Sequence, residues 1–148
     1  MSIRLSPDEA WAEIENAHTA SLTTLRSDGW PVTLPVWFVV IDRAVYVRTP
    51  AQTKKVARVR HDERACFTVE RGEKWAELCA VAMQCTASIV DDEAVKQQVS
   101  TLLDKKYSAF RMSGDVPAAT RQHYANNAFI KLEPHGRLLT WDNARIGS

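Results

Sequence analysis

Glycine is scarce in this sequence, with five residues in 148. No G-x-G-x-x-G, no Walker-type glycine and lysine loop and no G-x-S-x-G occurs among them. These are the loops that bind dinucleotides and nucleoside triphosphates, or that present a serine nucleophile. Their absence argues against a Rossmann dinucleotide enzyme, a P-loop hydrolase and an α/β-hydrolase.

Cysteine and histidine are also few, and their spacing is not that of a metal site. Cys66, Cys79 and Cys85 lack C-x-x-C spacing and stand in apolar, strand-like contexts, so we expect buried free thiols. The four histidines lie far apart and show neither H-x-H nor i, i+4 spacing. We therefore expect no metal bound by the protein.

Neither an excess of one charge nor a long apolar run is present. The 19 basic and 18 acidic residues give a formal net charge of +1, so no overall field favours nucleic acid or an anionic membrane surface. No run approaches the ~20 apolar residues that span a bilayer, and the first residues lack the apolar core of a signal peptide. We expect a cytoplasmic protein with neither nucleic acid nor membrane as partner.

What is present is a hydrophobic fraction of 45%, spread along the chain with no repeat and no linker. This amount suits one globular domain over residues 1–148. Runs rich in β-branched and aromatic residues alternate with turn signals, including an Asp-Gly turn at residues 28–29. We expect strands at residues 20–25, 32–41, 44–49, 65–70, 80–90, 128–133 and 136–141.

Helices are indicated at a few places between these strands. Ser6-Pro7 followed by acidic residues is a helix-start signal, so a first helix is expected to run to about His18. Apolar positions at helical spacing predict a short helix within residues 50–62 and a longer one from Asp91 to Tyr107. Pro117 is expected to start another short helix. Together, these strands and helices predict a mainly β fold, a closed architecture of six or seven antiparallel strands with flanking helices.

Two features of the chain hint at a ligand. Pro35 lies within a predicted strand and has no N–H to donate to a neighbouring strand. It therefore marks a sheet edge, a bulge or a place where the backbone is free to meet a ligand. Residues 48–55, Arg-Thr-Pro-Ala-Gln-Thr-Lys-Lys, place two hydroxyls and two lysines between a strand and a helix start. Lysines and helix-start amides bind phosphate well. The same residues also suit two threonine helix caps beside solvated lysines and arginines, and from this stretch alone both interpretations stay open.

The order of these motifs resembles the pyridoxamine-5'-phosphate-oxidase-like, FMN-binding split β-barrels. The family pattern is a strand of the form "LaTl..dG.P.v.pvwf", then "lyv.T....KK...lr.dpr..ftv", then "V...G.a.iv.d". Here these segments are residues 21–38, 45–69 and 81–92. The ending at residues 136–142 is similar to that of short actinobacterial-type members, several of which use the deazaflavin coenzyme F-420. The resemblance implies a split barrel.

The resemblance also assigns a cofactor site. It implies that Thr33, Leu34, Pro35, Val36 and Trp37 line the flavin ring. It implies that Thr49, Thr53, Lys54 and Lys55 hold the phosphate. FMN is the expected cofactor and coenzyme F-420 the alternative; both carry a phosphate and a flat tricycle. Coenzyme F-420 also bears an acidic tail, for which Arg58 and Arg60 could extend the basic track of the lysines, and both arginines equally suit ordinary surface charges.

Two departures from the family pattern bear on function. Cys85 stands where the family often has glycine, which puts a close backbone approach there in question. The chain also lacks the longer C-terminal motif with which pyridoxamine-phosphate oxidases grip their substrate, so oxidation of vitamin B6 is not the first expectation.

The resemblance implies a homodimer in which two subunits share each cofactor. The expected function is an oxidoreductase that moves hydride to or from a small organic substrate, with no catalytic side chain of its own because the cofactor does the chemistry. The alternatives are a non-catalytic flavin, deazaflavin or haem carrier of the same fold, and an interaction domain with an empty barrel.

Overall fold

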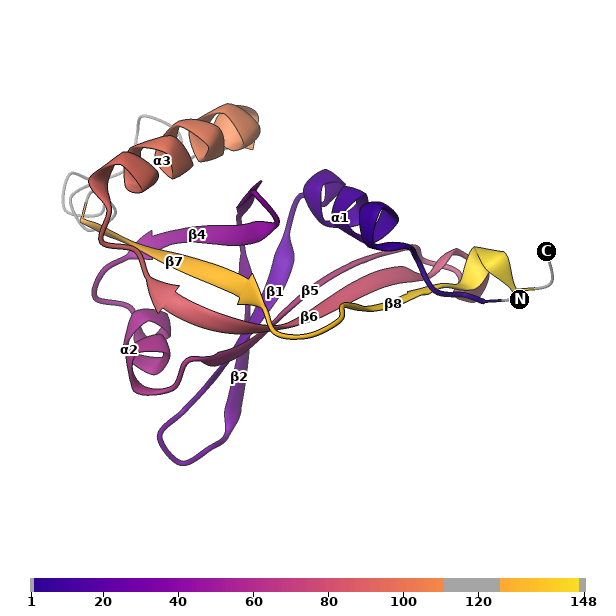
Figure 1. Ribbon diagram of the computed structural model, residues 1–148, viewed down its shortest axis with the longest axis horizontal. Helices are drawn as coiled ribbons and strands as arrows, with labels where there is room; N and C mark the ends of the chain where they lie inside the picture. Colours follow the sequence, from indigo (N-terminus) through magenta and orange to yellow (C-terminus); the bar gives the residue numbers. More distant parts are fainter. Residues whose placement is uncertain (1, 111–125, 147–148) are drawn as a thin grey trace.

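A computed structural model describes residues 2–110 and 126–146, and in this part of the chain one antiparallel sheet carries the fold (Figure 1). Seven strands follow one another in the order β2-β1-β5-β6-β7-β4-β3, and an eighth, β8, pairs with β6. The strands are β1 (Ala20–Leu25), β2 (Pro31–Val36), β3 (Val39–Ile41), β4 (Ala44–Pro50), β5 (Arg64–Arg71), β6 (Cys79–Ile89), β7 (Asn127–Pro134) and β8 (Leu139–Asp142). The expected mainly β split barrel is confirmed.

The strand expected at residues 32–41 is interrupted, which accounts for the eighth strand. β2 ends at Val36 and β3 begins at Val39, and the backbone of Phe38 between them bonds to side chains instead of to a strand. Its N–H donates to Tyr107 Oη (3.0 Å) and its carbonyl accepts from Lys106 Nζ (3.0 Å). Because these side chains replace the ladder, the chain can pass from one end of the strand order to the other.

Three α-helices of the described residues lie outside the sheet: α1 (Pro7–Asn16), α2 (Lys54–His61) and α3 (Glu93–Tyr107). Short 3-10 turns follow at η1 (Trp75–Glu77), η2 (Ser108–Phe110) and η3 (Asn143–Arg145). In Figure 1, α3 lies beside β4 and β7, and α2 lies at the opposite side of the sheet. The three helices were expected within a few residues of their bounds, and the short helix expected from Pro117 lies outside the described residues.

The hydrophobic core is the inner face of the curved sheet. Alternate side chains of the strands enter it, as the strict alternation of buried and open positions along β1 shows. Its largest fully buried side chains include Ile14, Leu22, Phe38, Phe67, Met83, Ile130 and Leu132. A smaller cluster forms where Val99, Leu103 and Tyr107 of α3 pack on Val39, Tyr46 and Phe129. This second cluster anchors α3 against β3, β4 and β7.

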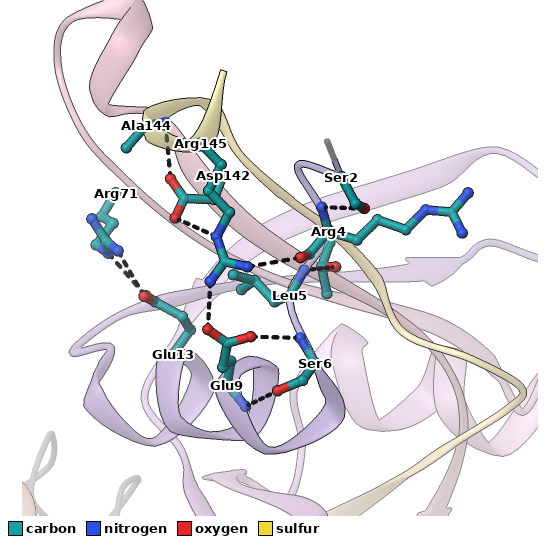
Figure 2. Close-up of polar contacts among 11 residues, drawn as sticks. Ser2, Arg4, Leu5, Ser6, Glu9, Glu13, Arg71, Asp142, Ala144 and Arg145 are labelled. Atoms are coloured by element: carbon teal, nitrogen blue, oxygen red, sulfur yellow. Dashed lines mark hydrogen bonds and ion pairs between the residues drawn. The ribbon is translucent and has the colours of Figure 1, made fainter. Parts of the chain in front are cut away.

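The two chain ends are joined by polar contacts over α1 (Figure 2). The Arg145 guanidinium pairs with the Glu9 carboxylate, and it also donates to Asp142 (3.3 Å) and to the carbonyl of Arg4 (3.0 Å). Glu9 in turn accepts from the backbone N–H of Ser6 (2.9 Å), which completes a capping box at the start of α1. The N-terminal helix is thereby fixed to η3 at the far end of the sequence.

The described residues contain three free cysteines and no helix suited to a membrane. Cys79 and Cys85 are buried as expected, whereas Cys66 is half-buried. Burial raises the pKa of the Cys85 thiol to about 12, so it stays protonated in the core. No helix among these residues is long and apolar enough to cross a bilayer. Nor do they contain a group of three or more His, Cys, Asp or Glu side chains placed to hold a metal ion.

Candidate functional site

The segment expected to hold phosphate lies where β4 passes into α2. Thr49 is buried at the end of β4, and its Oγ1 lies 3.4 Å from Thr53 Oγ1. Thr53 is the N-cap residue of α2, yet its side chain makes no capping hydrogen bond. The hydroxyls therefore contact each other, and the first-turn amides of α2 receive no capping bond from Thr53. The structure brings the two threonines together but does not use Thr53 as a cap.

The lysines that follow differ in their surroundings. Lys54 is exposed and Lys55 is half-buried. Burial, with a smaller contribution from the Arg58 cation nearby, holds the pKa of Lys55 below its usual value. No carboxylate in the described part of the chain forms an ion pair with Lys54, Lys55 or Arg58. Uncompensated cations beside uncapped helix amides suit an anionic group.

Arg48, at the start of the same segment, is already engaged. Its guanidinium pairs with Asp104 of α3 at 3.2 Å, and its side chain is largely covered. This ion pair fastens β4 to α3, so Arg48 is less available to a ligand than the lysines of α2.

Arg58 connects α2 to the β1–β2 hairpin. It follows Lys55 by three positions and so lies on the same face of the helix. Its Nε donates to Oγ1 of Thr24, a residue of β1 that is 1% exposed, at 2.7 Å. Its Nη2 is buried and has no hydrogen-bond partner. Thr24 pairs with Val32 of β2, so this contact links the expected phosphate segment to the strand expected to line the ring.

Of the residues expected to line the ring, four lie in β2, which is an edge strand of the described sheet, and Trp37 comes directly after it. Thr33 and Pro35 are exposed and share the face of Thr23 and Ser21, their partners in β1, whereas Leu34 lies on the other face. Thr33 Oγ1 lies 2.8 Å from Thr23 Oγ1. Val36 is buried. The four residues within β2 thus share one edge strand but do not point to one side.

Trp37 turns toward α3. Its indole stacks on the ring of Tyr107, with centroids 4.4 Å apart and planes 5° from parallel. His18 lies edge-on to both rings and to Phe110. The indole is 37% exposed, so one part of it stays open while the stack fixes its orientation.

Four surface cavities of the described residues are lined by residues other than those expected to bind the cofactor. The one nearest to β2 has a volume of about 510 Å³ and includes Thr23, the partner of Thr33. Its wall also contains Cys66, Gln84 and His135. The other three, of about 750, 440 and 410 Å³, lie beside α1 and α3. None of the nine expected residues lines these four cavities of the described residues.

Some residues of the site were missed from the sequence. Thr24 and Tyr107 gave no signal, because each acts through a contact with a distant segment. Arg58 was expected only in a basic track for an acidic tail or as a surface charge, although its i, i+3 spacing from Lys55 places both cations on one helix face.

Comparisons with known proteins agree with this architecture. The family model of pyridoxamine 5'-phosphate oxidase matches residues 6–141. A conserved hypothetical protein of Mycobacterium tuberculosis superposes with a TM-score of 0.84 at 23% identity, covering 99% of this chain and 91% of that chain. No curated protein matches the chain in sequence.

Two further solved structures share the fold. The haem storage protein of Vibrio cholerae has a TM-score of 0.73 at 12% identity, with 98% of this chain and 100% of that chain covered. A FAD-binding protein of Mesorhizobium loti has a TM-score of 0.72 at 16% identity, with 92% and 94% covered. At such identities the likeness establishes the fold alone.

Proposed function

Because the chain belongs to the pyridoxamine 5'-phosphate oxidase family, we propose that it is an oxidoreductase that uses FMN, or alternatively coenzyme F-420. The observation that carries the proposal is the start of α2, where uncapped amides and uncompensated cations meet. A phosphate monoester is the anionic group common to both cofactors, and it suits such donors.

We assign the phosphate to Thr49, Thr53, Lys54 and Lys55. Thr53 and the two lysines are placed to donate, and the buried Thr49 acts through its contact with the Thr53 hydroxyl. The lysines neutralise charge, while the first-turn amides of α2 add directed donors. This division of roles explains why Thr49 is buried although it belongs to a binding segment.

We assign the ring to the strand from Thr33 to Trp37. The bound cofactor supplies a hydride acceptor or donor, and its substrate is a small organic molecule. The chain's own contribution is to orient the ring and exclude water. Pro35 has no backbone N–H to donate to a neighbouring strand. The stack on Tyr107 holds Trp37 in place. No side chain is required as a nucleophile, which agrees with the absence of a catalytic constellation in the sequence.

We propose a homodimer with shared sites, assembled through the outer face of the sheet. One row crosses this face from Pro35 through Ser21, Thr68 and Ala82 to Leu139. The first four are small or flat, which permits close approach, and Leu139 is 56% exposed. A second copy of this chain is the proposed cover for this face, because the small side chains admit another sheet and Leu139 offers it an exposed apolar contact. The row includes Pro35, so a partner on it would enclose the expected ring site.

A spectral titration tests the function. The cofactor-free protein is titrated in parallel with FMN and with coenzyme F-420, and dissociation constants are read from the fluorescence of the ligand. Tight binding of either one supports the proposal and identifies the chemistry to screen. Binding without turnover over a broad substrate panel would favour the carrier alternative, for flavin, deazaflavin or haem. Binding of neither would leave the interaction domain.

A further inference from the structure

The side chain of Arg58 has a donor that nothing in the described structure satisfies. A guanidinium carries five N–H donors. Nε donates to Thr24, whereas the buried Nη2 has no acceptor. Buried donors are paired in most proteins, and an unpaired donor on a charged group is costly, so such an exception calls for an explanation.

The charge of Arg58 is equally uncompensated. No carboxylate of the described residues pairs with it. Lys55 responds to this charge: it has the same sign, and Arg58 helps to lower its pKa. Two like charges on one helix face repel each other unless an anion lies between or beside them.

The position of Arg58 is set from outside its own helix. Thr24 is almost fully buried in β1 and holds Nε at 2.7 Å. The guanidinium is thereby kept against the hairpin, where it cannot swing into solvent as Arg60, exposed two residues later, can.

We propose that Arg58 is the third cation of the phosphate site, that it makes the affinity for the cofactor depend on the phosphate, and that Thr24 is its positioning residue. This inference rests on the proposed function and deepens it. Bound phosphate supplies the negative charge that Lys55 and Arg58 lack, and an acceptor for the spare donors of the guanidinium.

The test compares each cofactor with its phosphate-free form. Riboflavin and FMN differ only in the phosphate, so the ratio of their dissociation constants measures what the phosphate contributes. Arg58→Gln is expected to weaken FMN about tenfold to a hundredfold, the range for losing a charge-assisted contact, and to leave riboflavin unchanged. Arg60→Gln removes the same charge from the same helix and is the matched control, with less than about a threefold change.

Thr24→Val keeps the shape of the strand residue and removes the acceptor for Nε. It is expected to weaken FMN but not riboflavin, and Arg58→Gln in the Thr24→Val background should cost less than in the parent. Arg58→Lys restores the charge and is expected to recover part of the lost affinity. These variants also carry the test if Arg58→Gln fails to fold, which circular dichroism establishes.

Three results would overturn the inference while leaving the function intact: a parent that binds FMN no better than Arg58→Gln does, equal losses for FMN and riboflavin, or an Arg60→Gln variant as weak as Arg58→Gln. A parent that binds neither FMN nor coenzyme F-420 would instead overturn the proposed function, and this inference with it. The same pairing, coenzyme F-420 against its phosphate-free chromophore, applies if the deazaflavin is the ligand that binds.

Discussion

The indole of Trp37 lies parallel to the ring of Tyr107, 4.4 Å from it between centroids. Seventy positions of sequence separate these residues, and the hydroxyl of Tyr107 also serves the strand break itself. It accepts from the N–H of Phe38 (3.0 Å) and lies within hydrogen-bond distance of the carbonyls of Phe38 (3.1 Å) and His18 (2.8 Å). One side chain of α3 thus fixes both the end of β2 and the tryptophan that follows it.

Tyr107→Phe is the first prediction. It removes the hydroxyl and leaves the buried N–H of Phe38 without its acceptor, so the free energy of unfolding should fall by about 1–3 kcal/mol. Urea denaturation measures this. Ser108→Ala removes an exposed hydroxyl from the adjacent residue and should change stability by less than about 0.5 kcal/mol. A Tyr107→Phe variant as stable as the parent would show that the backbone at Phe38 finds other partners.

Lys106 should make stability depend on alkaline pH. Burial lowers the pKa of this lysine to about 8, although its ammonium donates to the Phe38 carbonyl and lies 3.7 Å from the centroid of the Phe38 ring. Between that value and the ordinary lysine pKa of 10.5, the unfolded chain binds more protons than the folded one, so stability rises with pH.

The measurement for Lys106 is urea denaturation of the parent and of Lys106→Met across this pH window. The stability of the parent relative to the variant is expected to increase from pH 8 to pH 10, where ~10 is close to the pKa of an unfolded lysine. Lys105→Met, a change at the exposed neighbouring lysine, is the control. A difference that stays flat or falls would contradict the assignment of a buried ammonium.

Glu9 should make stability depend on acid pH, and here too stability rises with pH. The backbone N–H of Ser6, followed by the Arg145 side chain, lowers the pKa of this carboxyl from its ordinary 4.5 to about 2 (Figure 2). Its stabilising effect is present above pH 4.5 and is lost as the pH falls toward 2. The parent should therefore exceed Glu9→Gln in stability at neutral pH and converge with it in acid. Glu15→Gln, at an exposed position of the same helix, should show no such convergence.

Removing both lysines of the phosphate segment tests the proposed site. Lys54→Ala with Lys55→Ala should raise the dissociation constant for FMN at least about tenfold, since charge-assisted contacts contribute roughly 1.5–3 kcal/mol each. Fluorescence titration gives the constants, and Lys74→Ala with Lys105→Ala, at exposed positions elsewhere, is the charge-matched control. A double variant that binds FMN as tightly as the parent would remove this site assignment.

Leu139→Glu tests the proposed dimer. A carboxylate at this exposed apolar position would have to be buried between copies without a partner, so the dimer should dissociate. Sedimentation equilibrium measures the oligomeric state, and the titration with FMN should weaken in parallel if the sites are shared. Gln98→Glu adds the same charge on the exposed face of α3 and should leave the dimer intact. A monomeric parent would refute the dimer outright.

Local pattern predicted most of the secondary structure. Alternating residues in β1 and β2, the Asp-Gly turn between them and the Ser6-Pro7 helix start all appear close to where the sequence places them. Such signals work because strand and helix periods and turn geometries depend on neighbours a few residues apart. The motif order also identified the family, since it spans most of the chain.

The arrangement of the site was not readable in the same way. The sequence by itself determined which segments become strands and helices and which lysines and threonines fall between β4 and α2. Only the tertiary structure decided that Phe38 breaks a strand, that Trp37 stacks on Tyr107 and that Arg58 is held against Thr24. Each of these depends on contacts between segments far apart in the chain. A sequence pattern of period two or 3.6 carries no information about which distant side chain will bond to a backbone group that lacks a strand partner, or to a cation that lacks a carboxylate.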